Sequence, residues 1–510
     1  MNSAAPMAQP LTGGRMWLVV MAIALGNFLV VLDTTIANVS IPTIAGTLGV
    51  SSSQGSWVIT SYAVAEAITV PLTGWLAGRF GAQRVFVSCY LAFAALSLLC
   101  GLSGSLGMLV VCRILLGLCG GPIMPLAQTL LMRILPPEKQ TLGTVIWAMT
   151  TLVGPIVGPV LGGLLCDNVG WSSIFFINVP VAAAGGMLLL YMLRGRNDAT
   201  VKARIDGVGL ALLVIWVGAL QIMLDEGRNH DWFASTEICV LAVVAAIGFV
   251  SFLIWQLTER NPIVDLRIFR HRGFVAAACT YALGFGAFFA NVVILPLWMQ
   301  QNLGYTATWA GYATGMMGLL AVVSAPIVGK MLETIDARWI ICIGILGQAG
   351  LAAWRMTFTT DVTFWQMAVP TLLTGPCMVM FFIPTTGLAI ASVAPGEEAN
   401  AAGLSNFMRT LAGAFATSLV QTGWANQTTR AQTALAGAMP MGSATIDGMV
   451  DNGQSHDSAI AALDNLVQSQ SVMLATIHMF GIIAVCFVAA AALIWLAPRA
   501  EGPIDTSGGH

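Results

Sequence analysis

The segment TLVGPIVGPVLGGLL, residues 151–165, decides the fold. Its glycines and prolines recur at every fourth position and end in a doubled glycine: Gly154, Pro155, Gly158, Pro159, Gly162 and Gly163. Residues four apart lie on one face of a helix, so the glycines form a groove along which a second helix approaches at backbone distance. The prolines remove two backbone donors and permit a bend. The segment therefore predicts a membrane helix in close contact with another helix, whether for function or as an ordinary packing stripe.

The composition is that of a polytopic membrane protein. Of the 510 residues, 57% are hydrophobic and only 9% are charged, and the mean hydropathy is +0.83. Soluble proteins carry about 25% charged residues. The net charge of −2 gives no reason to expect a nucleic-acid partner. The ten cysteines lie in or beside apolar segments without CxxC spacing, so we expect helix packing rather than a disulfide or a metal site.

Fourteen apolar runs are long enough to cross about 30 Å of hydrocarbon. They are residues 16–40, 56–77, 85–103, 107–131, 141–165, 174–193, 206–224, 235–257, 274–299, 308–329, 339–356, 364–391, 398–421 and 472–497. An even number of spans places both termini on one side of the membrane. If that side is the cytoplasm, most Lys and Arg residues are cytoplasmic, and outside the membrane on the other side lie only Arg228, Arg355 and Arg430. We therefore expect cytoplasmic termini.

The chain also repeats itself. Gly49 precedes Pro71 by the same number of residues as Gly304 precedes Pro326, and each proline is followed three positions later by glycine. Parallel six-helix repeats are a transporter architecture. The predicted parts are an N-terminal six-helix bundle (1–193), two inserted linker helices with their connections (194–272), a C-terminal six-helix bundle (273–497) that includes a periplasmic loop (422–471), and a cytoplasmic tail (498–510).

Several motifs resemble those of the major facilitator superfamily. The pattern G-P-x-x-G-P-x-x-G-G resembles the antiporter motif of its drug exporters. The segment GWLAGRFGAQR, after the second run, resembles the cytoplasmic loop motif of the superfamily at four positions: Gly74, Arg79, Gly81 and Arg84. Gly78 occupies the position where that motif usually has an aspartate. The resemblance therefore implies the tight turn and the basic flank, and it does not imply a salt bridge made by that aspartate.

Two further segments are similar to those of the fourteen-helix drug:proton antiporter branch, in particular its EmrB-type exporters. They are LDTTIANVSIP (32–42) and CRILLGLCGG (112–121), the second with Leu116 in place of the usual glutamine. The resemblance implies an all-α major facilitator fold of two six-helix bundles plus two inserted helices. It also implies proton-driven export of hydrophobic or amphipathic drugs across the bacterial inner membrane, without a cofactor. A periplasmic membrane-fusion adaptor and an outer-membrane channel are the implied partners, and the polar segment 422–471 suits such docking.

Other function classes fit the sequence less well. A proton-coupled transporter of a metabolite or sugar and a non-transporting membrane sensor remain alternatives. An ATP-driven pump would need the motif G-x-x-x-x-G-K-[ST], which the sequence lacks. The five histidines are scattered along the chain, so we do not expect an enzyme.

Charge inside the membrane marks the candidate chemistry. A lone ionisable side chain at a helix centre costs about 2.5 to 3.5 kcal/mol, so it tends to be functional or paired. Asp33, Glu66 and Arg113 lie about 10 to 15 Å below the outer surface at 1.5 Å per residue, so we expect them to share one layer. Burial favours a protonated carboxyl and a nearby guanidinium favours an ionised one, so protons and cationic substrates would compete for it. A structural acid satisfied by its neighbours is the alternative for Asp33, and Glu66 is open between the two roles.

The substrate cavity is expected among aromatic and methionine side chains of the second bundle. The candidates are Phe285, Phe289, Trp298, Met316 and Phe381, together with Arg409. Soft, adaptable side chains suit a site that accepts varied apolar compounds, although interhelical packing explains any single one. We further expect the glycine groove of residues 154–162 to pack against a helix of the second bundle and to seal the outer side against protons.

Overall fold

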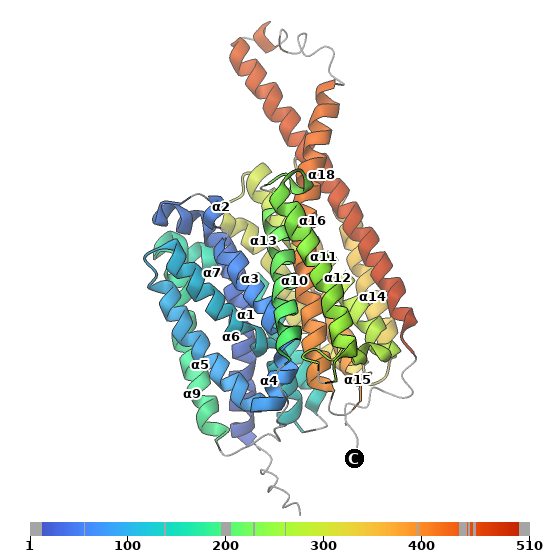
Figure 1. Cartoon of the computed structure of the whole chain (residues 1–510). Coiled ribbons are helices and arrows are strands. Elements are labelled where there is room, and N and C mark those ends of the chain that lie inside the picture. Colours follow the sequence, from blue (N-terminus) through green and yellow to red (C-terminus); the bar gives the residue numbers. More distant parts are fainter. Residues whose placement is uncertain are drawn as a thin grey trace, which may run out of the picture.

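The computed structural model describes residues 13–50, 52–55, 57–136, 139–194, 206–227, 230–260, 262–394, 397–437, 446, 449–451 and 455–498. Within these ranges every regular element is a helix, and the long helices stand side by side in one bundle (Figure 1). The first part of the chain forms α1 (Gly13–Leu48), α2 (Ser52–Gly55), α3 (Trp57–Thr69), α4 (Thr73–Phe80), α5 (Ala82–Gly101), α6 (Leu106–Ile134), α7 (Gln140–Asn168), α8 (Ser173–Phe176) and α9 (Asn178–Met192).

A hairpin of two helices follows, and then the second part of the chain. The hairpin consists of α10 (Gly207–Glu226) and α11 (Thr236–Thr258), with the short η2 (Trp232–Ala234) between them. After η3 (Leu266–Arg270) come α12 (Arg272–Asn302), α13 (Ala307–Met331), α14 (Ala337–Arg355), α15 (Phe364–Ala391), α16 (Glu398–Gly437), α18 (His456–Leu493) and η4 (Ile494–Leu496).

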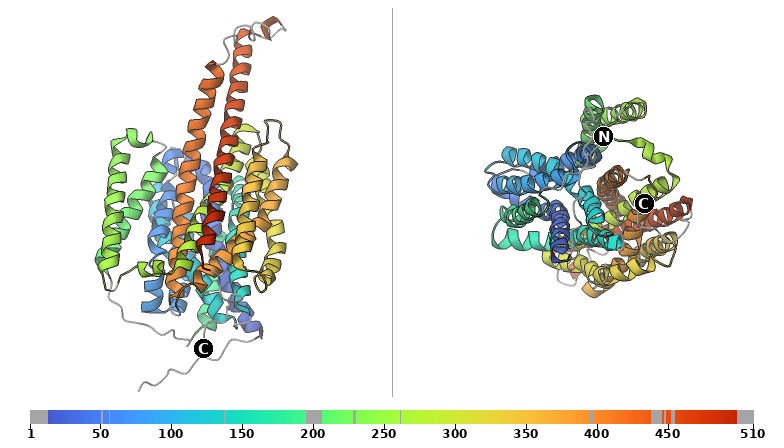
Figure 2. Two further views of the ribbon diagram at one scale, coloured as in Figure 1. Left: turned by 90° about the vertical axis from the view of Figure 1, so that its right-hand side faces the viewer. Right: turned by 90° about the horizontal axis from the view of Figure 1, so that it is seen from below.

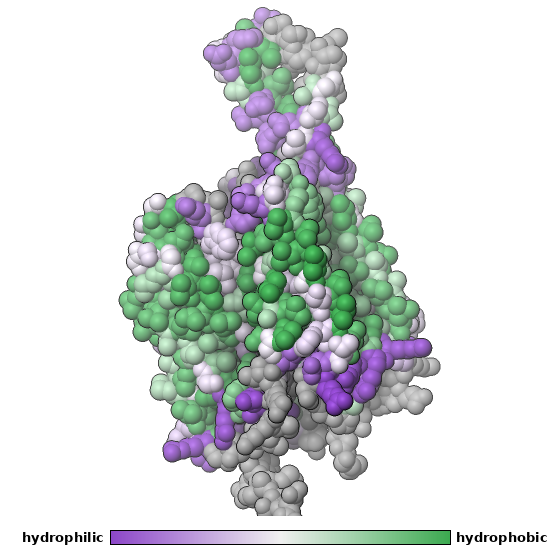
Figure 3. Space-filling view, in the orientation of Figure 1, coloured by the Kyte–Doolittle hydropathy of each residue, from purple (hydrophilic) through white to green (hydrophobic). Residues whose placement is uncertain are grey.

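Each of the fourteen predicted runs lies on helix. Eleven helices of the described chain are long and apolar enough to span a membrane, and α7 makes a twelfth although it bends by 44° between Pro155 and Val160. The two remaining runs fail this test for visible reasons. Run 56–77 is divided into α3 and α4, and run 398–421 lies in α16, which is less apolar than the other long helices. Apolar side chains cover the flank of the bundle in Figure 3, and polar ones gather at its ends. The chain is a multi-pass membrane protein.

Local signals set where the helices begin and turn. The Ser105 hydroxyl accepts a hydrogen bond from the backbone N–H of Met108 at the start of α6, and Asp206 accepts one from Gly209 (2.8 Å) at the start of α10. Such caps satisfy donors that the first helical turn leaves unpaired. Gly81 connects α4 to α5 with φ of 91°, a backbone conformation that favours glycine. This is the tight turn predicted for the loop motif.

The helices pack in two groups. In the first, α1 packs against α7, α3 against α6, and α5 against both α6 and α9. In the second, α13 and α14 pack against α15, and α12 packs against α16 and α18. The groups meet where α7 packs along α13 and α6 along α16, while α10 contacts both α3 and α16. This packing supports the division into bundles 1–193 and 273–497, which stays a proposal.

Two helices project beyond the rest at one end of the bundle. They are α16, with 40 residues, and α18, with 38 (Figure 2). We call this end the distal face and the end with the α4–α5 turn the proximal face. The polar segment 422–471 is therefore largely helical where the structure describes it, because it consists of the distal parts of α16 and α18.

Candidate functional site

An ion pair buried in the distal half of the first group joins three helices. Arg113 on α6 donates from Nη1 to Oδ2 of Asp33 on α1, and both side chains are 0% exposed. The other carboxylate oxygen, Oδ1, accepts a hydrogen bond of 3.0 Å from Nδ2 of Asn178, the first residue of α9. Asp33 is thus the point at which α1, α6 and α9 are tied together. The predicted proximity of Asp33 and Arg113 is what the structure shows.

A fourth helix, α3, holds the guanidinium of Arg113. Its Nε donates to the backbone carbonyl of Val58 at 2.8 Å, and the guanidinium lies over the Tyr62 ring, 4.3 Å from its centroid. Cation–π contacts of this kind are strongest where water is excluded. The glycines of the segment CRILLGLCGG make the approach possible, because a Cβ on Gly117 would lie 2.9 Å from Cβ of Ala65 on α3. Glycine here brings the α6 backbone onto α3.

Glu66 lies deeper than the ion pair. It is 7% exposed and follows Tyr62 by one helical turn, or about 6 Å along α3. Within the described residues no Lys, Arg or His side chain makes an ion pair with its carboxylate. The prediction that Asp33, Glu66 and Arg113 form one layer is therefore right for two residues. Glu66 lies about one helical turn below them on α3.

Polar side chains also meet across the two groups, between α6 and α16. Arg409 donates from Nη2 to Sδ of Met124 at 2.6 Å, and its guanidinium lies 4.9 Å from the centroid of the Phe285 ring. One turn away, Nδ2 of Asn406 lies 3.5 Å from Oε1 of Gln128. Both residues on α16 are buried. Arg409 thus belongs to the contact between the two groups, where a movement of one against the other would change its surroundings.

An aromatic cluster lies beside Arg409 at the same contact. Phe285 stacks on Phe289 at 5.7 Å, and Tyr281 links Phe285 to Phe381 on α15. Trp147 of α7 stacks on Phe382 at 5.6 Å, so this cluster includes both groups of helices.

Two predicted members of the substrate cavity lie outside this cluster. Trp298 stacks on Phe358, which follows α14 on the distal side, and Met316 lines a lateral groove described below. The sequence predicts them as cavity residues from residue type alone, and residue type does not determine which side of a helix faces the cavity.

The glycine groove of α7 packs against α1. A Cβ on Gly154 would lie 2.8 Å from Cβ of Val31, and one on Gly158 would lie 2.8 Å from Cβ of Thr35. Gly162 faces Ile36 in the same way. The expectation of a partner in the second group was wrong, because periodicity shows that a close contact exists and not which helix makes it. The opposite side of α7 does meet the second group, where Val160 packs against Gly311 of α13.

Comparison with known proteins gives the family. The sequence model of the Major Facilitator Superfamily matches residues 23–417. The chain belongs to this superfamily. It is 40% identical over 506 residues to multidrug export protein EmrB of Escherichia coli strain K12, covering 98% of each chain. It is 38% identical over 504 residues to fatty acid resistance protein FarB of Neisseria gonorrhoeae, covering 98% of this chain and 99% of that one.

Solved structures of the superfamily share the fold. The human organic anion transporter MFSD10 aligns with a TM-score of 0.60 at 12% identity, over 95% of this chain and 100% of that one. The proton:xylose symporter XylE aligns with a TM-score of 0.59 at 14% identity, over 96% and 98% of the two chains. The all-α major facilitator fold expected from the sequence is confirmed.

The superfamily loop motif lies at the proximal face. A Cβ on Gly74 would lie 2.9 Å from Cγ of Asn400 on α16, so this glycine allows α4 to contact the second group. Arg79 lies over the Trp75 ring at 5.5 Å, and Arg84 is in the first turn of α5. A Cβ on Gly78, which replaces the usual aspartate, would have no described neighbour within 4 Å. The turn is therefore retained while the site of the missing carboxylate is open.

Three residues of the site are absent from the sequence-based prediction. They are Asn178, which binds Asp33, and Tyr62 and Phe175, whose rings flank Arg113. Asn178 stands within the segment WSSIFFINVP (171–180), and an amide in an otherwise apolar run is the available signal. The two aromatic residues carried no such signal, because aromatic side chains are common in membrane helices.

Proposed function

We propose that the protein is a proton-driven exporter of hydrophobic and amphipathic small molecules. The observation that carries this proposal is the buried Asp33–Arg113 pair, an acid in a membrane span whose ionisation is coupled to the packing of α1, α3, α6 and α9. Intramembrane ionisable groups of this kind are typical of proton relays. Similarity over nearly the whole chain to proteins described as multidrug exporters supports the same function.

Protonation of Asp33 is the proposed switch. The ionised carboxylate holds Arg113 and Asn178, and adding a proton removes the charge that attracts the guanidinium. Arg113 would then keep its contacts with Val58 and Tyr62 on α3 and with the Phe175 ring, and α1 would be free to shift. Because α1 packs on the glycine face of α7, and α7 packs along α13, the shift would reach the second group. Small changes at such a site are amplified where two packed arrangements exist.

The substrate would bind between the two groups. The aromatic cluster around Phe285 provides an apolar, polarisable surface, and Arg409 lies against it. Glu66 is buried on α3, about one turn below the Asp33–Arg113 pair, and we propose it as the second proton-carrying carboxyl. A cationic or amphipathic compound that approaches Glu66 would compete with a proton for the same carboxylate. Such competition between a proton and the substrate for one carboxylate would couple their movements in opposite directions, which is antiport.

The orientation and the partners also belong to this proposal. We place the proximal face and both termini in the cytoplasm, as the distribution of Lys and Arg predicts, and the distal face in the periplasm. Residues 422–437 of α16 would then project about 24 Å beyond the predicted span, at 1.5 Å per residue. This two-helix projection would dock the membrane-fusion adaptor, and through it the outer-membrane channel, that the EmrB-type resemblance implies.

Efflux from whole cells tests the function. Cells that produce the protein are loaded with a lipophilic fluorescent dye, and dye loss is followed with and without a protonophore. We expect faster loss than in cells with an empty vector, and we expect the protonophore to remove the difference. A difference that persists with the protonophore would exclude a proton-driven exporter. No difference at all, with the protein present in the membrane, would favour the metabolite transporter or the sensor.

A further inference from the structure

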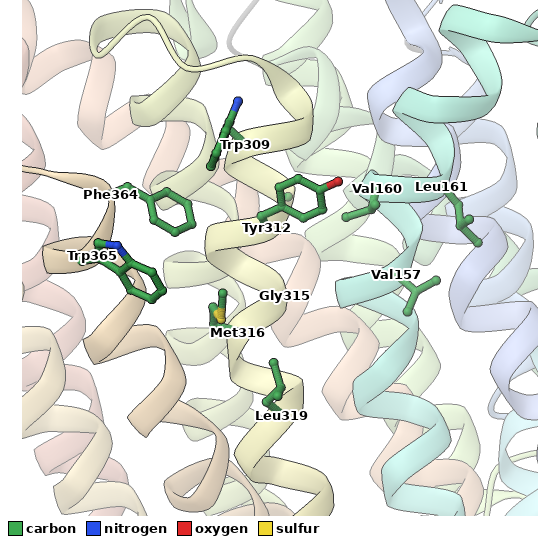
Figure 4. Close-up of a pocket in the computed structure, with 11 residues that line it drawn as sticks. Val157, Val160, Leu161, Trp309, Tyr312, Gly315, Met316, Leu319, Phe364 and Trp365 are labelled. Atoms are coloured by element: carbon green, nitrogen blue, oxygen red, sulfur yellow. The ribbon is translucent and has the colours of Figure 1, made fainter.

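A lateral groove opens between α7, α13 and α15 in the distal half of the bundle (Figure 4). Its volume is about 480 Å³, within the range of about 300 to 1,000 Å³ that is usual for small-molecule sites. Among the residues that shape it are Val157, Val160 and Leu161 on α7, Tyr312 and Leu319 on α13, and Trp365 on α15. Among the lining residues that the structure describes, none is charged. The groove is therefore built for an apolar, uncharged group.

The groove faces the bilayer and not the centre of the protein. Leu319 is 64% exposed and Trp365 is 66% exposed, as expected for side chains that line an open, outward-facing surface. From Trp309 to Leu319 the lining follows α13 for ten residues, or about 15 Å. This length is half of the hydrocarbon core, which is about 30 Å thick. The groove therefore extends through one leaflet, and it is continuous with the hydrocarbon of that leaflet.

Aromatic side chains with polar tips mark the distal end of the groove. Trp309 and Tyr312 lie near the start of α13, and Trp365 lies near the start of α15 (Figure 4). Tryptophan and tyrosine are enriched where the hydrocarbon meets the headgroups, because the ring is apolar and the N–H or O–H is not. One end of the groove thus matches the headgroup level, and the other reaches toward the middle of the bilayer.

We propose that this groove is a binding site for one acyl chain of a phospholipid in the distal leaflet. The groove is uncharged, as long as one leaflet is deep, and open to the bilayer along its length, and these are the properties of an acyl-chain site. Its two walls belong to different groups of helices. They touch where Val160 of α7 packs against Gly311 of α13, so closely that a Cβ on Gly311 would lie 2.8 Å from Cγ2 of Val160. The site therefore exists only while α7 and α13 are in contact.

A bound chain would favour that contact. A ligand shifts a conformational equilibrium toward the state that it binds better. Parting of α7 from α13 at the distal face would divide the groove and release the lipid. The proposed site thus links the lipid of the distal leaflet to the closed arrangement seen here. It rests on the groove itself and holds whether or not the protein is an exporter.

Photo-crosslinking of the whole protein in vesicles tests the proposal. The vesicles contain phosphatidylethanolamine and phosphatidylglycerol, with a trace of phosphatidylethanolamine that carries a diazirine on one acyl chain. After irradiation, adducts are located by peptide mass spectrometry. We expect them to concentrate on residues 309–319 and 364–365. The internal reference is α11, where Ile247 and Ile254 are 63% and 61% exposed to lipid without lining the groove.

Two variants and one matched control define the site. Gly315→Phe fills the groove, and Gly311→Phe, which also lies in the groove lining, pushes α7 away from α13. Val323→Phe adds the same side chain to α13 at a position that is 61% exposed and outside the groove. We expect adducts on 309–319 to fall to the level of α11 in the first two variants and to remain in the control. If the first two variants fail to reach the membrane, the comparison of α13 with α11 in the unchanged protein decides alone.

Two results would overturn the proposal. Adducts spread evenly over α11 and α13 in the unchanged protein would show ordinary contact with bulk lipid. Loss of the adducts on 309–319 when a lipophilic cationic dye is added would show that the groove takes export substrates in preference to an acyl chain. If adducts concentrate on residues 309–319 and 364–365 and the dye leaves this labelling unchanged, the lipid site is supported.

Discussion

Removing the charge of Asp33 while keeping its shape separates the two roles of the buried ion pair. Asp33→Asn leaves the Arg113 guanidinium, which is 0% exposed, without a counter-charge. Breaking a buried pair by neutralising one partner costs about 3 to 5 kcal/mol, because the other charge stays buried and uncompensated. We therefore expect Asp33→Asn to lose about that much free energy of unfolding and to lose proton-coupled efflux as well.

The double variant Asp33→Asn with Arg113→Gln distinguishes a structural role from a functional one. It removes both charges, so no unpaired ion remains in the membrane, and the loss of stability should be largely recovered. Efflux should not recover, because no carboxylate is left to carry the proton. Asn178 would still have an amide oxygen as its partner at position 33, so the contact between α1 and α9 need not be lost.

Two assays are needed on the same preparations. The free energy of unfolding is measured in mixed micelles with increasing dodecyl sulfate, and dye efflux is measured after reconstitution with an imposed pH gradient. Full efflux by the double variant would show that the pair only holds the helices together. Full efflux by Asp33→Asn alone would refute the reasoning more directly, since it would show that proton coupling does not need this carboxylate.

Three further variants test other parts of the site. Arg113→Lys keeps the charge but loses the planar guanidinium that contacts Val58, Tyr62 and Asp33 at once. At equal amounts of protein in the membrane, efflux should therefore fall well below that of the unchanged protein. Efflux equal to that of the unchanged protein would show that charge alone suffices. Glu66→Gln should weaken export of cationic dyes more than export of neutral ones, measured side by side, and equal effects on both would remove Glu66 from the substrate site. Gly158→Leu should separate α7 from α1, abolish efflux and raise passive proton leak through vesicles. Gly163→Leu, at a position where a Cβ has no described neighbour within 4 Å, should have none of these three effects.

Much of the fold was predictable because the bilayer imposes its own pattern. A span needs about twenty apolar residues, and that requirement yields fourteen candidate spans without any knowledge of packing, of which eleven or twelve meet the test in the described chain. It fails to distinguish a continuous span from a broken one, since α3 and α4 together fulfil it although the chain turns between them. It does not apply to the polar segment beyond the membrane, where the Ala- and Gln-rich stretches permit the helices that α16 and α18 continue there.

The site was predictable where depth and charge were sufficient. Asp33 and Arg113 could be paired because unpaired charge is costly in hydrocarbon and both lie at matching depth. The rotation of each helix was not predictable in the same way. Helices in a membrane are apolar on all sides, so the sequence does not show that the glycines of α7 face α1, or that Met316 lines the lateral groove. The contribution of Asn178 was missed for a related reason, because its role depends on the rotation of α9.

Simultaneous measurement of proton and substrate movement tests the proposed mechanism most directly. Purified protein is reconstituted into vesicles that hold a pH-sensitive dye, a lipophilic cationic substrate is added, and the flux of both is recorded without any other driving force. Substrate movement in one direction should be accompanied by proton movement in the other, and both should be absent in Asp33→Asn. Substrate transport with no proton movement, or proton movement that is unchanged in Asp33→Asn, would contradict proton antiport through the buried pair.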